Sequence, residues 1–122
     1  MFNSMKFQNL GCWQRARKLA VDIYKITMKG KLDVDFCFRD QLRRSAVSIA
    51  SNIAEGKERG TAPEFVRFLC IAKASAAELI TLLSIAKDIG YINKKDFQDL
   101  ERRIMEISYM IGGLIKSIKQ RQ

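Results

Sequence analysis

Apolar residues along the chain recur every three or four positions, which is the spacing of one face of an α-helix. Four helices are predicted, at residues 9–29, 36–58, 62–89 and 94–119. No stretch alternates apolar and polar residues as a half-buried strand does. Since short links join these long helices, the pattern predicts a single all-α domain over residues 1–122, an antiparallel up-down-up-down four-helix bundle. A long three-helix arrangement is the alternative.

Polar residues and glycines mark the expected helix ends. Asp33 or Asp35 is the predicted N-cap of the second helix, and Asn93 of the fourth. The third opens with a capping box of Thr61 and Glu64, and the only proline lies in its first turn. Glycines mark the predicted ends of the first three helices: Gly30 for the first, Gly56 with Gly60 for the second, and Gly90 for the third.

Two adjacent glycines, Gly112 and Gly113, lie inside the fourth predicted helix. Each costs about 1 kcal/mol relative to alanine at a helix interior position. Either a bend or a close contact with another helix would account for them. The sequence alone does not choose between the two.

The chain is strongly basic, with 22 Lys and Arg residues against 13 Asp and Glu residues and a net charge of +9. The excess lies in residues 1–31 and 91–122, which contain the first and last helices. Neighbouring basic helices favour phosphate contacts with RNA or DNA. A solvated surface that is merely basic is the alternative. The predicted nucleic-acid-binding residues are Arg15, Lys18, Lys25, Lys29, Arg102, Lys116 and Lys119.

The two middle helices have few charges. No charged residue lies between Arg44 and Glu55, although an exposed helix face usually carries some. A second subunit is therefore expected to cover this region, making the protein a homo-oligomer. The predicted interface is a flank of small residues, Val47, Ala50 and Ala54. An uncharged but exposed surface is the alternative.

The sequence argues against catalysis, metal binding and a cofactor. It contains no His, which removes the commonest general base and the commonest metal ligand. Ser48, Asn52 and Glu55 follow one another at helical spacing, and Glu78 is expected near them on the third helix. Since no base is expected beside Ser48, these residues are interpreted as a structural hydrogen-bond network. No glycine-rich phosphate-binding motif is present.

Three cysteines, Cys12, Cys37 and Cys70, are 25 and 33 residues apart. This spacing is typical of neither a disulfide framework nor a zinc site, and it favours small buried thiols in a reducing compartment. No secretory signal is recognised, and no uncharged apolar stretch approaches the roughly 20 residues of a membrane span. We therefore expect a cytoplasmic protein without a membrane partner.

Four segments resemble the family of 23S rRNA intervening-sequence proteins, which are four-helix bundles. The most specific is QLRRSAVSIASNIAEGKERG, at residues 41–60. EFVRFLCIAKASAAEL at residues 64–79 and LGCWQRARKLAVDIYKIT at residues 10–27 are similar to two further segments of the family. The Gly-Tyr-Ile turn at residues 90–92 also fits. The resemblance covers nearly the whole chain.

The resemblance implies a small cytoplasmic bacterial protein without catalytic residues. It also implies similarity to the accessory variability protein of diversity-generating retroelements, a basic pentamer of four-helix subunits that binds nucleic acid and a reverse transcriptase. A homopentamer and a reverse-transcriptase-like or other protein partner are expected on that basis. The resulting hypothesis is a non-catalytic, basic, homo-oligomeric protein that binds RNA or DNA. The alternative is a protein–protein adaptor or assembly scaffold with no physiological nucleic-acid role.

Overall fold

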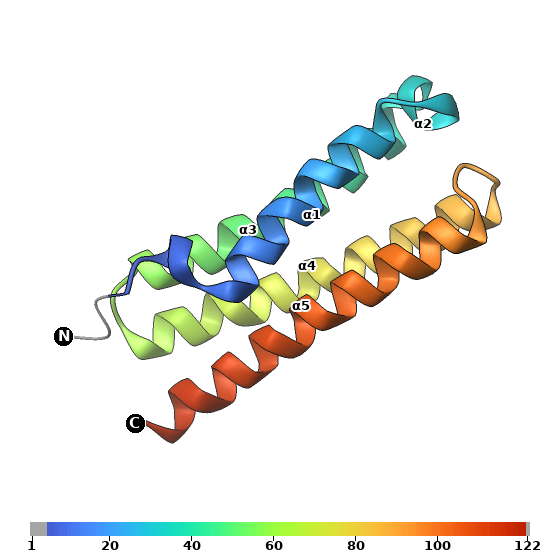
Figure 1. Cartoon of the computed structure of the whole chain (residues 1–122). Helices are drawn as coiled ribbons and strands as arrows, with labels where there is room; N and C mark the ends of the chain where they lie inside the picture. The colour runs from blue at the N-terminus through green and yellow to red at the C-terminus, as the bar shows by residue number, and fades with distance from the viewer. Residues whose placement is uncertain (1–4, 122) are drawn as a thin grey trace.

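The computed structural model describes residues 5–121, which contain helices and no strand (Figure 1). The prediction of an all-helical chain is confirmed over these residues. The four long helices are α1 (Gly11–Thr27), α3 (Phe36–Glu58), α4 (Ala62–Asp88) and α5 (Lys94–Gln120). Two short elements were not predicted, the single 3-10 turn η1 (Phe7–Asn9) and the five-residue helix α2 (Gly30–Val34).

Each long helix packs against two others. The contacts join α1 to α3, α3 to α4, α4 to α5, and less extensively α1 to α5. Within residues 5–121, neither α1 and α4 nor α3 and α5 come within 8 Å of each other, Cα to Cα. The α1–α3 and α4–α5 pairs therefore form opposite sides of the molecule. Figure 1 shows that α1 begins and α5 ends at the same end, while α2 lies at the other.

The core between these helices is aliphatic. Its largest fully buried side chains on the long helices are Leu19, Ile23, Leu42, Ile49, Ile53, Leu69, Leu79, Leu83, Ile104, Ile107 and Ile111. They recur at the helical spacing of the sequence pattern, so each helix contributes one continuous stripe. This core fixes which flanks of α1 and α5 meet.

Gly56 and Gly60 were predicted to mark the end of the second helix, which is right for Gly60 and wrong for Gly56. α3 continues through the buried Gly56, and Gly60 follows the helix with a φ of +83°. A Cβ on Gly56 would lie 2.7 Å from Phe68 Cβ and 3.2 Å from Phe65 Cδ1. Glycine is therefore required here because α3 and α4 approach closely, and Gly60 supplies the left-handed turn.

The glycine pair in α5 has a different environment. The helix runs without interruption from Lys94 to Gln120. A Cβ on Gly112 would lie 3.6 Å from Lys73 Nζ, and a Cβ on Gly113 would meet nothing within 4 Å. A close helix contact is therefore not the reason for this pair.

Side-chain hydrogen bonds cap the N-termini of α3, α4 and α5, but not that of α1. The Asp35 carboxylate, rather than that of Asp33, caps α3 by accepting from the Phe38 N–H at 3.2 Å. Its other oxygen accepts from the Tyr91 hydroxyl at 2.7 Å, which joins the start of α3 to the α4–α5 turn. Asn93 caps α5 as predicted, accepting from the backbone N–H of Asp96 at 2.7 Å.

The expectation that all three thiols are buried is wrong for two of them. Cys12 is buried in the first turn of α1, and burial raises the pKa of its thiol. Cys37 and Cys70 are exposed. Cys37 lies in the first turn of α3, at the end of the molecule, and Cys70 lies on the solvent-facing side of α4.

Of the helices in residues 5–121, α4 alone is long and apolar enough, by length and composition, to cross a membrane. Only 44% of its most apolar window is buried. One face of α4 belongs to the core, with Phe65, Leu69 and Leu79 among its buried residues. The rest of its apolar character therefore lies on the surface, where Ile71 and Ile85 are 38% and 44% exposed.

Candidate nucleic-acid interface

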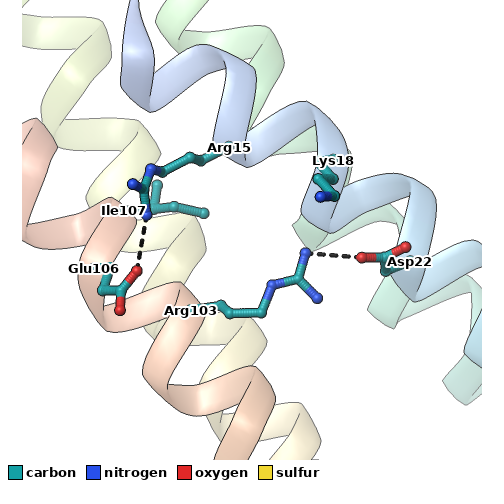
Figure 2. A pocket seen from close by; sticks show the side chains of 6 residues that line it. All are labelled: Arg15, Lys18, Asp22, Arg103, Glu106 and Ile107. Carbon is teal, nitrogen blue, oxygen red and sulfur yellow. Dashed lines mark hydrogen bonds and ion pairs between the residues drawn. The ribbon is translucent and has the colours of Figure 1, made fainter.

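A charged pocket lies where α1 meets α5 (Figure 2). Residues three and four apart share one face of a helix, so α1 and α5 each present a charged flank beside the core. The pocket lies between these two flanks. The pocket has a volume of about 350 Å³. It is lined by Arg15, Lys18 and Asp22 from α1 and by Arg103, Glu106 and Ile107 from α5.

Two ion pairs cross this pocket. Arg15 Nη1 lies 2.9 Å from Glu106 Oε2, and Arg103 Nη2 lies 2.8 Å from Asp22 Oδ2. Figure 2 shows Lys18 on α1 between Arg15 and Asp22. Lys18 forms no ion pair in the part of the chain that the structure describes. Its ammonium group is therefore the cation that remains available to an anion.

Two of the predicted binding residues, Arg15 and Arg102, meet around one carboxylate. Glu106 pairs with Arg15 and also lies 3.8 Å from Arg102, which in turn lies 3.7 Å from Asp99. Lys18 is in the same pocket. Much of the positive charge here is therefore neutralised within the protein, which the sequence prediction did not include.

The other predicted residues lie elsewhere. Lys25 lines a groove between α1 and α3, away from the α5 side. Lys29 follows the end of α1, whereas Lys116 and Lys119 are exposed near the end of α5. Because α5 ends where α1 begins, Lys29 is at the opposite end of the molecule from the last two (Figure 1). The seven residues thus form a discontinuous band rather than one compact patch.

Arg103, Asp22 and Glu106 were missed as site residues. A signal for Arg103 exists, because it lies three residues after the core residue Leu100 and four before Ile107. That spacing puts its side chain beside the core, on a flank that faces a neighbouring helix. Which helix would lie there could not be read from α5 alone.

A second surface depression, the α1–α3 groove, is almost wholly apolar and has a volume of about 630 Å³. The rings of Phe7 and Trp13 meet edge to face in it, with centroids 5.3 Å apart. All three residues predicted for the subunit interface line it. The groove consists of Phe7, Trp13, Arg17, Ala20, Val21, Tyr24, Lys25, Met28, Val47, Ala50, Ser51 and Ala54.

The predicted structural network on α3 is present in part, with Ser48 and Asn52 but without Glu55 or Glu78 among the described residues. The Oγ atoms of Ser48 and Ser75 lie 2.8 Å apart and join α3 to α4, while Asn52 Nδ2 donates to Ser48 Oγ at 2.9 Å. Glu55 instead pairs with Arg59 at 3.2 Å. Among residues 5–121, no three His, Cys, Asp or Glu side chains are grouped to hold a metal ion.

Comparisons with known proteins agree with the resemblance seen in the sequence. The family model for the 23S rRNA-intervening sequence protein matches residues 8–113. A crystal structure from Bacteroides thetaiotaomicron is similar, with a TM-score of 0.78 and 25% identity over 86% of this chain and 98% of that one. It is described as a protein with unknown function from the S23 ribosomal protein family. No curated protein matches the chain.

Proposed function

Because the chain belongs to the 23S rRNA-intervening sequence protein family, we propose that it is a non-catalytic, homo-oligomeric, cytoplasmic protein that binds RNA or DNA. The contacts are made to phosphate groups by α1 and α5. The observation that carries this proposal is Lys18, which lies with two paired arginines in the α1–α5 pocket and has no ion-pair partner within residues 5–121. The net charge of +9 supports attraction to a polyanion.

The proposed subunit is an antiparallel up-down-up-down four-helix bundle. Contacts between α1 and α3, α3 and α4, α4 and α5, and α5 and α1 support this architecture. In that arrangement the two basic helices, α1 and α5, are neighbours, so the phosphate backbone of one nucleic acid can contact both of them. Contacts of this kind position a nucleic acid without reading its sequence.

We propose a homo-oligomer because a large apolar groove remains uncovered in the single chain. Val21, Tyr24 and Val47 are 43%, 39% and 42% exposed in the α1–α3 groove, next to Ala50 and Ala54. Contiguous exposed apolar surface of this kind marks an interaction site. By resemblance, the assembly is a homopentamer, which would present several copies of a weak basic site to one nucleic acid.

Reversal of one charge tests the phosphate contact. Lys18→Glu is expected to weaken RNA binding about tenfold, which corresponds to the loss of one charge-assisted hydrogen bond of roughly 1.5 kcal/mol. Glu106→Gln is expected to tighten binding, because it frees Arg15 and Arg102 for the ligand. Binding is measured by fluorescence anisotropy with nuclease-treated protein.

The matched control is Lys95→Glu, which makes the same charge change on an exposed residue in the first turn of α5. It should reduce the affinity much less than Lys18→Glu. Equal losses in the two variants would mean that only the net charge matters, and the assignment to the α1–α5 pocket would be wrong.

A protein–protein adaptor or scaffold is the second candidate, and the apolar α1–α3 groove favours it. By resemblance, a reverse-transcriptase-like enzyme is one such partner. A protein retained in equal molar amount after nuclease treatment, and lost in a Val47→Arg variant, would support this function. The absence of RNA or DNA binding at low salt would then leave it as the leading explanation.

A further inference from the structure

One face of α4 is not covered by any other helix in the described part of the single chain. Its exposed residues at helical spacing are Cys70, Ile71, Ala74, Ala77, Thr81 and Ile85, hereafter the α4 face. Two exposed charged residues border this face, Glu78 on the side of α3 and Lys73 on the side of α5. Glu78 forms no ion pair within residues 5–121. A helix exposed to water along this length normally carries a charged outer face.

The α4 face and the α1–α3 groove have complementary shapes. The groove is a concave surface between two helices, whereas the α4 face is the convex surface of one helix. Their lengths also agree at 1.5 Å per residue, since Trp13 to Met28 spans about 22 Å and Ile71 to Ile85 about 21 Å. Small residues at Ala74 and in the groove at Ala50 permit close approach of the backbones.

Charge favours the same pairing. Arg17 and Lys25 are the charged residues of the groove, and neither forms an ion pair in the described part of the chain. Glu78, which borders the α4 face, has the opposite sign. Two grooves facing each other would bring these cations together and would leave two concave surfaces unfilled, so the groove is poorly suited to bind its own copy.

We propose that the α4 face of one copy packs into the α1–α3 groove of the next copy. The proposal rests on the homo-oligomer proposed above and specifies its contact surfaces. Because the two surfaces differ, the contact is head-to-tail, and repetition closes a ring when the rotation between neighbours permits it. α1–α3 lies opposite α4–α5, so one subunit engages two neighbours simultaneously.

Two blocking variants test this pairing. Val47→Arg adds a long cation to the groove, and Ala74→Arg adds one to the α4 face; both positions are exposed. Each variant alone should have the mass of one subunit, 14.0 kDa, by light scattering. An equimolar mixture should give a dimer, since the intact face of the first variant can enter the intact groove of the second, and the remaining surfaces are blocked.

Several results would overturn the proposal. If either variant keeps the wild-type mass, that surface is not part of the contact. If either variant alone remains a dimer, its intact surface binds its own copy. If both dissociate but their mixture stays monomeric, the two intact surfaces do not bind each other. A monomeric wild type would refute the homo-oligomer itself, whereas loss of RNA binding alone would leave the contact surfaces unaffected. Val34→Arg, at a 70% exposed valine outside both surfaces, is the matched control and should assemble normally.

The exposed thiols provide an independent readout. Cys70 belongs to the α4 face, whereas Cys37 lies beside it, in a pocket that Glu78 also lines. In the assembled wild type, maleimide should modify Cys70 severalfold more slowly than in the Val47→Arg variant. Equal labelling of Cys70 in the two proteins would contradict coverage of the α4 face, and unchanged helical circular dichroism would exclude misfolding.

Discussion

Gly56 sets the distance between α3 and α4 by having no side chain. The position a Cβ would occupy is 2.7 Å from Phe68 Cβ, which is attached directly to the backbone and cannot move aside as a side-chain end can. The tight contact lies in the segment that carries the family resemblance. A packing requirement therefore accounts for this glycine.

Gly56→Ala is expected to destabilise the protein by about 1–3 kcal/mol, because it forces the two helices apart in a packed region. Urea unfolding followed by circular dichroism measures the change. Gly113→Ala is the matched control: its Cβ would meet nothing within 4 Å, so better helix propensity should raise stability by up to about 1 kcal/mol. Equal effects at the two positions would refute the packing explanation.

The ion pairs of the α1–α5 pocket contribute more to its charge balance than to stability. The Arg15 and Glu106 side chains are 59% and 45% exposed, and exposed pairs of this kind contribute about 0–1 kcal/mol. A phosphate group can compete with Glu106 for Arg15 at small cost to the fold. Glu106 therefore limits the affinity of the pocket for an anion.

At the scale of the elements, α1 presents three different faces. Its core face holds Leu19 and Ile23, one flank faces the apolar groove with Val21 and Tyr24, and the other carries Lys18 toward α5. Sequence periodicity identified the core and the basic flank. Tyr24 is 39% exposed in the groove, because α3 covers only part of that flank.

The turn between α4 and α5 is held to the start of α3 by Tyr91. Its hydrogen bond to Asp35, together with loss of hydration and the nearby carboxylate charge, raises the pKa of the Tyr91 phenol above its ordinary value of 10.0. The folded state thus holds this proton more tightly than the unfolded state does. The stabilisation is complete below the unfolded pKa and is lost as pH rises through the folded one.

Tyr91→Phe should therefore lower the free energy of unfolding at neutral pH, and the difference from wild type should shrink above about pH 10. Urea unfolding at several pH values measures this difference. Tyr109→Phe is the control, since that ring is 86% exposed and makes no hydrogen bond described for residues 5–121. A difference that is constant through alkaline pH would contradict the Tyr91–Asp35 linkage.

At the scale of the whole molecule, the features that could be predicted from the sequence are those that depend only on residues close to one another in the chain. Helical periodicity and the Asn93 cap depend on neighbouring residues, and both were recognised. The five-residue α2 is too short to display a period. The pairing of Arg103 with Asp22 depends on which helices pack together, which no single helix reveals.

The same limit applies to the surfaces. The shortage of charge on the middle helices indicated the flank at Val47, Ala50 and Ala54, which now forms one side of the α1–α3 groove. The other side comes from α1, which contributes Trp13 to the groove. Counting charges likewise identified the basic helices but not the carboxylates of Asp22 and Glu106 that pair with their arginines.

The salt dependence of RNA and DNA binding tests the central claim most directly. Fluorescence anisotropy of the nuclease-treated wild type, with structured RNA and with duplex DNA, gives the affinity over a range of salt concentrations. We predict that log Kobs falls linearly as log salt rises, and that Lys18→Ala reduces the slope by about 1. Absence of binding at low salt, or a slope unchanged by Lys18→Ala, would contradict phosphate recognition by the α1–α5 pocket.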